Sequence, residues 1–276
     1  MSFKIISDSS SNIRSNEYEN FNSVPLKILL GNKEYVDDDE ILVETLVNDM
    51  ESSKEKCSTS CPNVFDWTKA FEDNDEIFAV TITSSLSGSY ASAVQAKEDF
   101  VSLNPNAKVC VLDSLSTGPE MELIIEKLIK LRESGATFEE AEKQIKQYMK
   151  KTHLLVTLES LKNLAKNGRV STTVAKLAGI LGIRIIGYAS EEGRLESIHK
   201  CRGEKKALEV LKEEMLKMGF KGGKLRISHC ENNNAAQLFK NTVLSIFPKS
   251  DIKIRQCTGL CSFYAERGGM IIGFES

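Results

Sequence analysis

Three short apolar runs in the first 115 residues each lead into a turn that carries serine. Residues 3–6 lead into 7–11, residues 77–82 into 83–89, and residues 109–112 into Asp113 and Ser114. Short runs rich in valine and isoleucine are typical of strands buried on both faces. Helical stretches at 90–100 and 120–131 follow the second and third runs. Strands that alternate with helices predict a parallel sheet, and such sheets bind ligands beyond the carboxyl ends of their strands.

The hydrophobic pattern changes near residue 150. Before it we expect a hairpin at 24–35, around Gly31 and Asn32, and a helix at 137–150 with Thr137 as its N-cap. After it, strands are predicted at 153–157, 184–188, 195–198, 224–228, 253–256 and 270–274, and helices at 158–167, 174–181, 207–218 and 235–245. We therefore expect an α/β fold with two domains: a Rossmann-like domain with a parallel sheet over 1–152, and an α+β domain with a mainly antiparallel sheet over 153–276.

Composition and charge exclude several classes of protein. The 276 residues are 41% hydrophobic and carry a formal net charge of −3. No apolar stretch is long enough for a transmembrane helix, and no basic footprint suggests nucleic-acid binding. The first residues lack the pattern of a signal peptide, so we expect a cytoplasmic protein. The acidic run at 37–40 is interpreted as a solvated loop or the first turn of a helix.

The seven cysteines are expected to be reduced thiols. Cys57 and Cys61 are four residues apart, as are Cys257 and Cys261, but no histidine stands at zinc-ligand spacing from either pair. We predict neither a metal site nor a cofactor.

The strongest candidate site is the turn at 83–90, Thr-Ser-Ser-Leu-Ser-Gly-Ser-Tyr. Several hydroxyl groups stand where a strand becomes a helix, and Gly88 lets a ligand approach the backbone. A helix cap needs only one of these hydroxyls, so we interpret the turn as a site for an anionic group. A second segment, 58–63, is interpreted either as an ordinary helix start with Pro62 or as the other half of this anion site.

An enzyme is the main alternative. A hydrolase or phosphatase would use Ser87 or Asp8, but a serine nucleophile needs a nearby base, and the chain has only His153, His199 and His229. The G-x-S-x-G, P-loop and G-x-G-x-x-G motifs are absent. Asp8 and Asp113 follow strands and could hold a metal, although both also suit turns.

Several motifs in order resemble the DegV family of bacterial fatty-acid-binding proteins, over essentially the whole chain. They are Asp8-Ser9, Thr59-Ser60-Cys61-Pro62, Ser84-Ser85-Leu86-Ser87-Gly88-Ser89-Tyr90, Asp113-Ser114, and the 158–171 segment with Gly168-Arg169-Val170-Ser171.

This resemblance implies one long-chain fatty acid, such as palmitate, held between two domains. It implies that Thr59 and Ser87 hold the carboxylate, with Ser60, Ser85 and Gly88 of the same turns beside them. Arg202 corresponds to a basic residue near the entrance in many members. The resemblance also implies a partner, a fatty acid kinase that phosphorylates the bound carboxylate. A binding protein for another small amphiphile is the second alternative.

The chain departs from the family pattern at two places. Asn63 replaces the serine that follows the proline. The segment 258–269 lacks the histidine that approaches the head group in many members, and Ala265 stands at its position. Either Tyr264, Glu266 or Arg267 replaces the histidine, or the presenting function is lost. The apolar helix at 174–181 is interpreted either as a wall of the acyl tunnel or as plain core.

Overall fold

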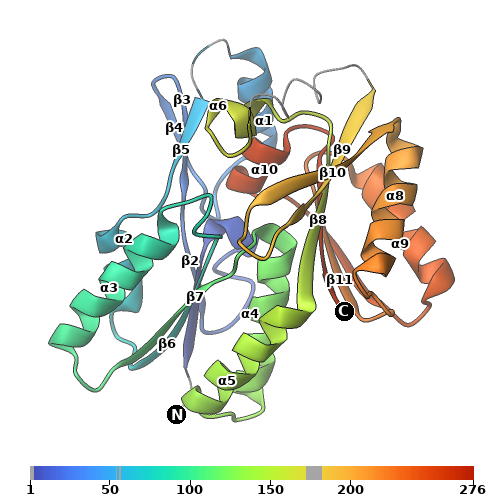
Figure 1. Cartoon of the computed structure of the whole chain (residues 1–276). Coiled ribbons are helices and arrows are strands. Elements are labelled where there is room, and N and C mark those ends of the chain that lie inside the picture. Colours follow the sequence, from blue (N-terminus) through green and yellow to red (C-terminus); the bar gives the residue numbers. More distant parts are fainter. Residues whose placement is uncertain (1–2, 54, 56, 172–181) are drawn as a thin grey trace.

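A computed structural model describes residues 3–53, 55, 57–171 and 182–276. Its first sheet, sheet A, has the strand order β2-β1-β6-β7, and all its pairings are parallel (Figure 1). The strands are β1 (Lys4–Asp8), β2 (Phe21–Val24), β6 (Glu76–Thr81) and β7 (Lys108–Asp113). The three apolar runs therefore form neighbouring parallel strands, as predicted.

Helices cover both faces of sheet A. On one face lie α2 (Val64–Phe71) and α3 (Ser89–Leu103), and on the other lie α4 (Gly118–Glu133) and α5 (Phe138–Tyr148) (Figure 1). The core between sheet A and the pair α2 and α3 contains Trp67, Phe71 and Phe100. The core between sheet A and the pair α4 and α5 contains Phe78 and Phe138. Two short 3-10 helices, η1 (Ser9–Ser11) and η2 (Met149–Lys151), complete this half.

Sheet C contains the strands from Thr152 onward, in the order β10-β9-β8-β13-β11-β12. They are β8 (Thr152–Leu158), β9 (Ile183–Ala189), β10 (Leu195–Arg202), β11 (Lys224–His229), β12 (Asp251–Gln256) and β13 (Met270–Glu275). All pairings are antiparallel except that of β11 with β12. Helices α8 (Glu204–Lys217) and α9 (Asn233–Ile246) cover its outer face (Figure 1). The predicted α/β fold, with its parallel and mainly antiparallel sheets, is confirmed.

A small third sheet, sheet B, has the order β4-β3-β5, from β3 (Lys27–Leu30), β4 (Lys33–Val36) and β5 (Cys57–Ser60). Near it lie α1 (Val43–Ser52), α6 (Lys162–Lys166) and α10 (Gly259–Ala265) (Figure 1). Although α10 is close to the C-terminus in sequence, it packs against α1, β3 and η1 of the N-terminal half.

Helix α4 lies between sheets A and C (Figure 1). On the side of α4 that faces sheet C, the carboxylate of Glu126 accepts hydrogen bonds from three basic residues of β11 and β12: Arg226 at 2.7 Å, Lys224 at 2.8 Å and Lys253 at 2.7 Å. Arg255 binds Glu122 of the same helix at 2.8 Å. A charge network therefore joins the two halves. The domain boundary at 152/153 stays a prediction.

Several predicted elements differ from the structure. The predicted helix at 158–167 is wrong at its start, because β8 continues to Leu158 and α6 spans only Lys162–Lys166. Gly168, at φ +74°, follows the helix. Residues 57–60 form a strand, and Asn63 caps α2 by a reciprocal pair of hydrogen bonds with Asp66. Helix α10 was not predicted. The predicted helix at 174–181 lies outside the described residues.

The acidic run is not uniformly solvated, because Asp37 is only 2% exposed. Its carboxylate accepts hydrogen bonds from the backbone N–H groups of Gly259 and Leu260, at the start of α10. Among the described residues, no helix combines the length and apolar character that crossing a membrane requires.

Candidate functional site

A cavity of about 320 Å³ lies between the inner face of sheet C and the serine-rich turns of the N-terminal half. Alternation along β8 points Leu154, Val156 and Leu158 toward it, while Leu155 packs against the outer helices. Leu26 and Ile82 line the opposite side. Its volume lies in the range usual for small-molecule sites, and most of its wall is hydrocarbon.

Hydroxyl groups gather along one part of the wall. They come from β5, from the turns after β6 and β7, and from α10. The residues are Thr59, Ser60, Thr83, Ser87, Ser116, Thr117 and Tyr264. A mainly apolar cavity with polar groups in one region suits an amphiphile.

Ser87 stands at the N-terminus of α3, where Gly88 is the N-cap residue. The Ser87 hydroxyl accepts a hydrogen bond from the Ser89 N–H at 3.2 Å, and it can still donate its own hydrogen to a ligand. The Ser89 hydroxyl is engaged elsewhere, since it donates to the carboxylate of Asp8 at 2.6 Å. The positive end of the α3 dipole favours an anionic group beside Ser87.

Thr59 and Tyr264 meet across the cavity wall, with 2.8 Å between their hydroxyl oxygens. Thr59 lies in β5 and Tyr264 in α10, so a contact between distant parts of the chain forms this part of the site. Burial raises the pKa of Tyr264, which keeps its phenol neutral and able to donate. The guanidinium of Arg169 lies 5.9 Å from the Tyr264 ring and brings positive charge to the same region.

Four of the six predicted ligand residues line this cavity: Thr59, Ser60, Ser87 and Gly88. The two others do not line it. Ser85 is exposed and donates to the backbone oxygen of Glu192 at 2.5 Å, in the turn between β9 and β10. Arg202 is exposed at the end of β10.

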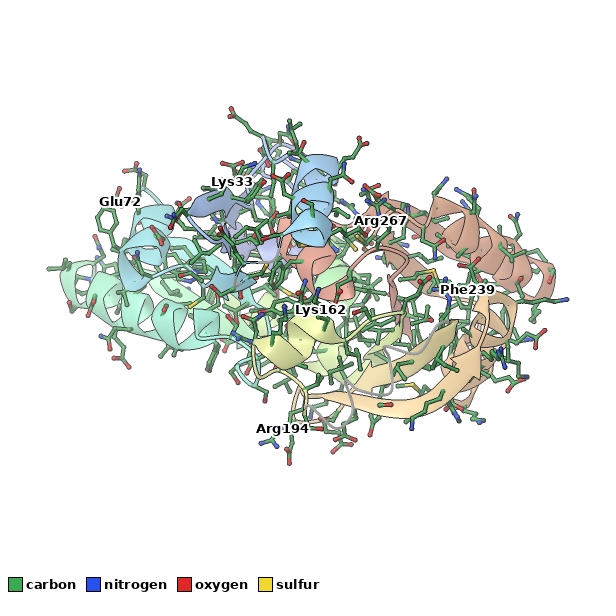
Figure 2. All side chains as sticks on the ribbon, turned by 90° about the horizontal axis from the view of Figure 1, so that it is seen from above. Lys33, Glu72, Lys162, Arg194, Phe239 and Arg267 are labelled. Carbon is green, nitrogen blue, oxygen red and sulfur yellow. The ribbon has the colours of Figure 1, made fainter. Side chains whose placement is uncertain are left out.

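Two arginines that were not predicted as ligands line the cavity instead, Arg169 and Arg194. Arg169 follows the glycine that ends α6, and its Nε donates to the backbone oxygen of Leu86 at 3.2 Å. In the sequence, Arg169 could have been recognised as a site residue from its place in the motif at 168–171. Arg194 lies in the turn between β9 and β10 (Figure 2), and no motif marked it.

The segment that lacks the family histidine contributes Tyr264 and Ala265 to the cavity wall. The two other predicted substitutes point to other partners. Glu266 accepts a hydrogen bond from the Asn163 N–H at 3.0 Å, and Arg267 pairs with Glu51 at 2.8 Å. Of the three candidates, Tyr264 is the one beside the hydroxyl groups.

The two aspartates named in the enzyme alternative both accept hydrogen bonds within the fold. Asp8 is fully buried and accepts hydrogen bonds from Ser10, Ser89 and the N–H of Ile82, so it is a structural cap. Asp113 accepts from two backbone N–H groups of neighbouring turns. Within the described part of the chain, no histidine lines the cavity and no group of side chains has the makeup of a metal site.

Comparisons with known proteins identify chains that are similar to this one over its whole length. The sequence profile described as "Uncharacterised protein, DegV family" matches residues 2–276. A DegV domain-containing protein of Streptococcus pyogenes serotype M18 is 39% identical, with 100% of each chain covered. A DegV domain-containing protein of Streptococcus pneumoniae R6 is 40% identical, over 100% of this chain and 99% of that protein.

Two solved structures are similar over almost the entire chain. A DegV family protein from Eubacterium eligens, loaded with heptadecanoic acid, has a TM-score of 0.97 at 43% identity and covers 99% of both chains. The fatty acid kinase B3 protein of Streptococcus pneumoniae, loaded with linoleic acid, has a TM-score of 0.98 at 40% identity, over 100% of this chain and 99% of that one. With a family profile matching nearly every residue, and relatives of this identity over the full length, the chain belongs to the DegV family.

Proposed function

We propose that this protein binds one long-chain fatty acid, such as palmitate, in the cavity between sheet C and the serine-rich turns of the N-terminal half. Thr59 and Ser87 hold the carboxylate, with Ser60, Gly88 and Tyr264 beside them, and the tail lies along the inner face of sheet C. The observation that carries the proposal is one cavity lined by a group of hydroxyl side chains and two arginines, with a mainly apolar wall of leucine, valine and isoleucine. Relatives that contain heptadecanoic and linoleic acid support it.

The energetics suit such a ligand. Each buried methylene stabilises the complex by roughly 0.8 kcal/mol, so the tail supplies most of the affinity. The carboxylate needs only a few donors to remain ionised and oriented. The N-terminus of α3 and the guanidinium of Arg169 both favour negative charge in the hydroxyl region.

The experiment compares single alanine variants of Thr59 and Ser87 with the wild type. Native mass spectrometry and extraction first identify the lipid that purifies with the protein, and a fluorescent fatty acid then measures affinity. Each variant loses one donor, and we expect roughly a three- to tenfold weaker complex. Ser85→Ala is the matched control, because Ser85 binds the β9–β10 turn rather than the cavity. Wild-type affinity in both variants would contradict the assignment.

We further propose that the protein acts in the cytoplasm and presents the carboxylate to a separate fatty acid kinase. The name of the Streptococcus pneumoniae relative supports this role. Phosphoryl transfer needs cradled phosphates and usually Mg²⁺, for which the chain has no recognisable motif. Acyl phosphate should form only when a kinase, ATP and Mg²⁺ are added. ATP consumption by this chain alone, abolished in Asp8→Asn, would instead favour an enzyme.

A further inference from the structure

A second, smaller pocket adjoins the cavity on the same face of sheet C. It measures about 10 Å³, about the least room that a single water molecule needs, so a methyl group enters only when a lining side chain turns aside. Three of its lining residues, Val156, Leu158 and Leu195, also line the main cavity. The two spaces are therefore separated by side chains rather than by backbone.

The strand register explains why the pocket lies there. Val156 of β8 pairs with Gly187 of β9, and Gly187 pairs with Ser197 of β10, so these three positions form one row across the sheet. Gly187 has no side chain, and its neighbours already stand close to where a Cβ would be; the nearest atom is the backbone oxygen of Glu196, at 2.8 Å. A Cβ at this position would lie 3.1 Å from Cδ1 of Leu195 and 3.4 Å from Cγ2 of Val156. The Leu195 side chain thus reaches over the glycine, between the two spaces.

We propose that the smaller pocket receives the methyl end of longer acyl chains, and that Leu195 sets the chain length that the protein prefers. This inference rests on the proposed function. Ile185, Val170 and Leu161 give the pocket an apolar wall, and Ser197 supplies a hydroxyl at its edge. The hydrocarbon tail is the part of the ligand that suits such an apolar wall. Leu195 is only partly buried, at the start of β10, so its side chain can turn aside more easily than a core residue.

The test measures the affinity of saturated fatty acids with 14, 16, 18 and 20 carbons for the wild type and two variants. Leu195→Ala removes the barrier, so the ratio of C18 or C20 affinity to C14 affinity should rise, by about fourfold for each methylene newly buried. Ser197→Leu fills the smaller pocket from the edge of the sheet. This variant should bind the longer fatty acids more weakly, while its affinity for the C14 acid stays that of the wild type.

Glu196→Leu is the matched control, because the neighbouring residue in a strand points to the opposite face. It should leave the ratio unchanged. If the wild type binds fatty acids but both variants keep its order of preference, this inference is wrong and the proposed function stands. If the wild type binds none of the four acids, the proposed function fails and this inference fails with it. If Ser197→Leu lowered the affinity for all four fatty acids equally, that result would also overturn the inference.

Discussion

At the scale of single residues, Tyr264 is the side chain that links the two halves of the chain at the site. Its phenol meets the hydroxyl of Thr59 at 2.8 Å, although the two residues are 205 positions apart in sequence. One of the two hydroxyls donates to the other, and the remaining hydrogen can point to a carboxylate. Tyr264 thus places a neutral donor next to Ala265, the position at which the family resemblance leads one to expect a histidine.

We expect Tyr264→Phe to weaken fatty acid binding by roughly three- to tenfold without changing the fold, because it removes one hydrogen bond and keeps the ring. Displacement of a fluorescent fatty acid measures the loss. Tyr188→Phe is the control, since Tyr188 donates to Glu196 away from the cavity. Equal affinity in the Tyr264 variant and the wild type would show that the Tyr264 hydroxyl does not contribute to binding.

Gly193 is a second residue whose identity the packing requires. It has φ +72°, and a Cβ there would lie 2.1 Å from the hydroxyl oxygen of Thr83, which itself donates to the Gly193 carbonyl. We expect Gly193→Ala to lower the free energy of unfolding by about 2–4 kcal/mol, from backbone strain and the steric clash together.

Urea unfolding measures this cost. The control is Gly135→Ala, because Gly135 has φ +76° but no atom within 4 Å of the added Cβ, so it reports the backbone strain alone, about 1 kcal/mol. Equal costs at the two glycines would show that the close approach to Thr83 is unimportant.

At the scale of elements, the position of α10 depends on a residue far away in sequence. The Asp37 carboxylate accepts the N–H groups of Gly259 at 2.6 Å and Leu260 at 2.9 Å, so it caps the helix that carries Tyr264. Burial raises the pKa of Asp37 to about 6, although these two N–H groups lower it in part. Near neutral pH the ionised carboxylate therefore faces two donors at the positive end of α10.

Asp37→Asn should lower the free energy of unfolding by about 1–3 kcal/mol, because an amide nitrogen then faces one of the two backbone donors. It should also weaken fatty acid binding, since Tyr264 depends on α10. Thermal unfolding and ligand displacement check both effects. Thr137→Ala removes the cap of α5 and should cost about 1 kcal/mol without changing affinity. Wild-type affinity in Asp37→Asn would contradict the link between cap and site.

At the scale of the whole molecule, the ion network between α4 and sheet C joins the halves that enclose the cavity. Burial alone would raise the pKa of Glu126, but hydrogen bonds from Arg226, Lys224 and Lys253 lower it to about 2. A carboxyl group with a lowered pKa stabilises the folded state above its unfolded pKa, near 4.5. That contribution is lost as the pH falls toward 2.

We therefore expect Glu126→Gln to lower the free energy of unfolding by about 3 kcal/mol at pH 7. The difference from the wild type should shrink between pH 4.5 and pH 2, where Glu126 becomes protonated in both states. Urea unfolding at several pH values measures it. Glu214→Gln, which removes the partner of the exposed Lys217 and His199, should change stability by less than about 1 kcal/mol. A difference that does not vary with pH would contradict the role of the Glu126 charge.

The sequence by itself determined the elements that local patterns specify. The apolar runs that became β1, β6 and β7, the serine turns at their carboxyl ends and the Thr137 cap all depend on residues close together in the chain. Short motifs shared with the DegV family named Thr59, Ser60, Ser87 and Gly88, and all four line the cavity.

Only the tertiary structure decided which distant groups complete the site. Helix α10 is seven residues long, too short to show a clear apolar period, and its position depends on Asp37. Arg169 lines the cavity and Arg202 does not, because the path of the chain after α6 and the direction of β10 decide where each side chain lies. Such positions follow from packing between distant segments, which no local pattern of residues encodes.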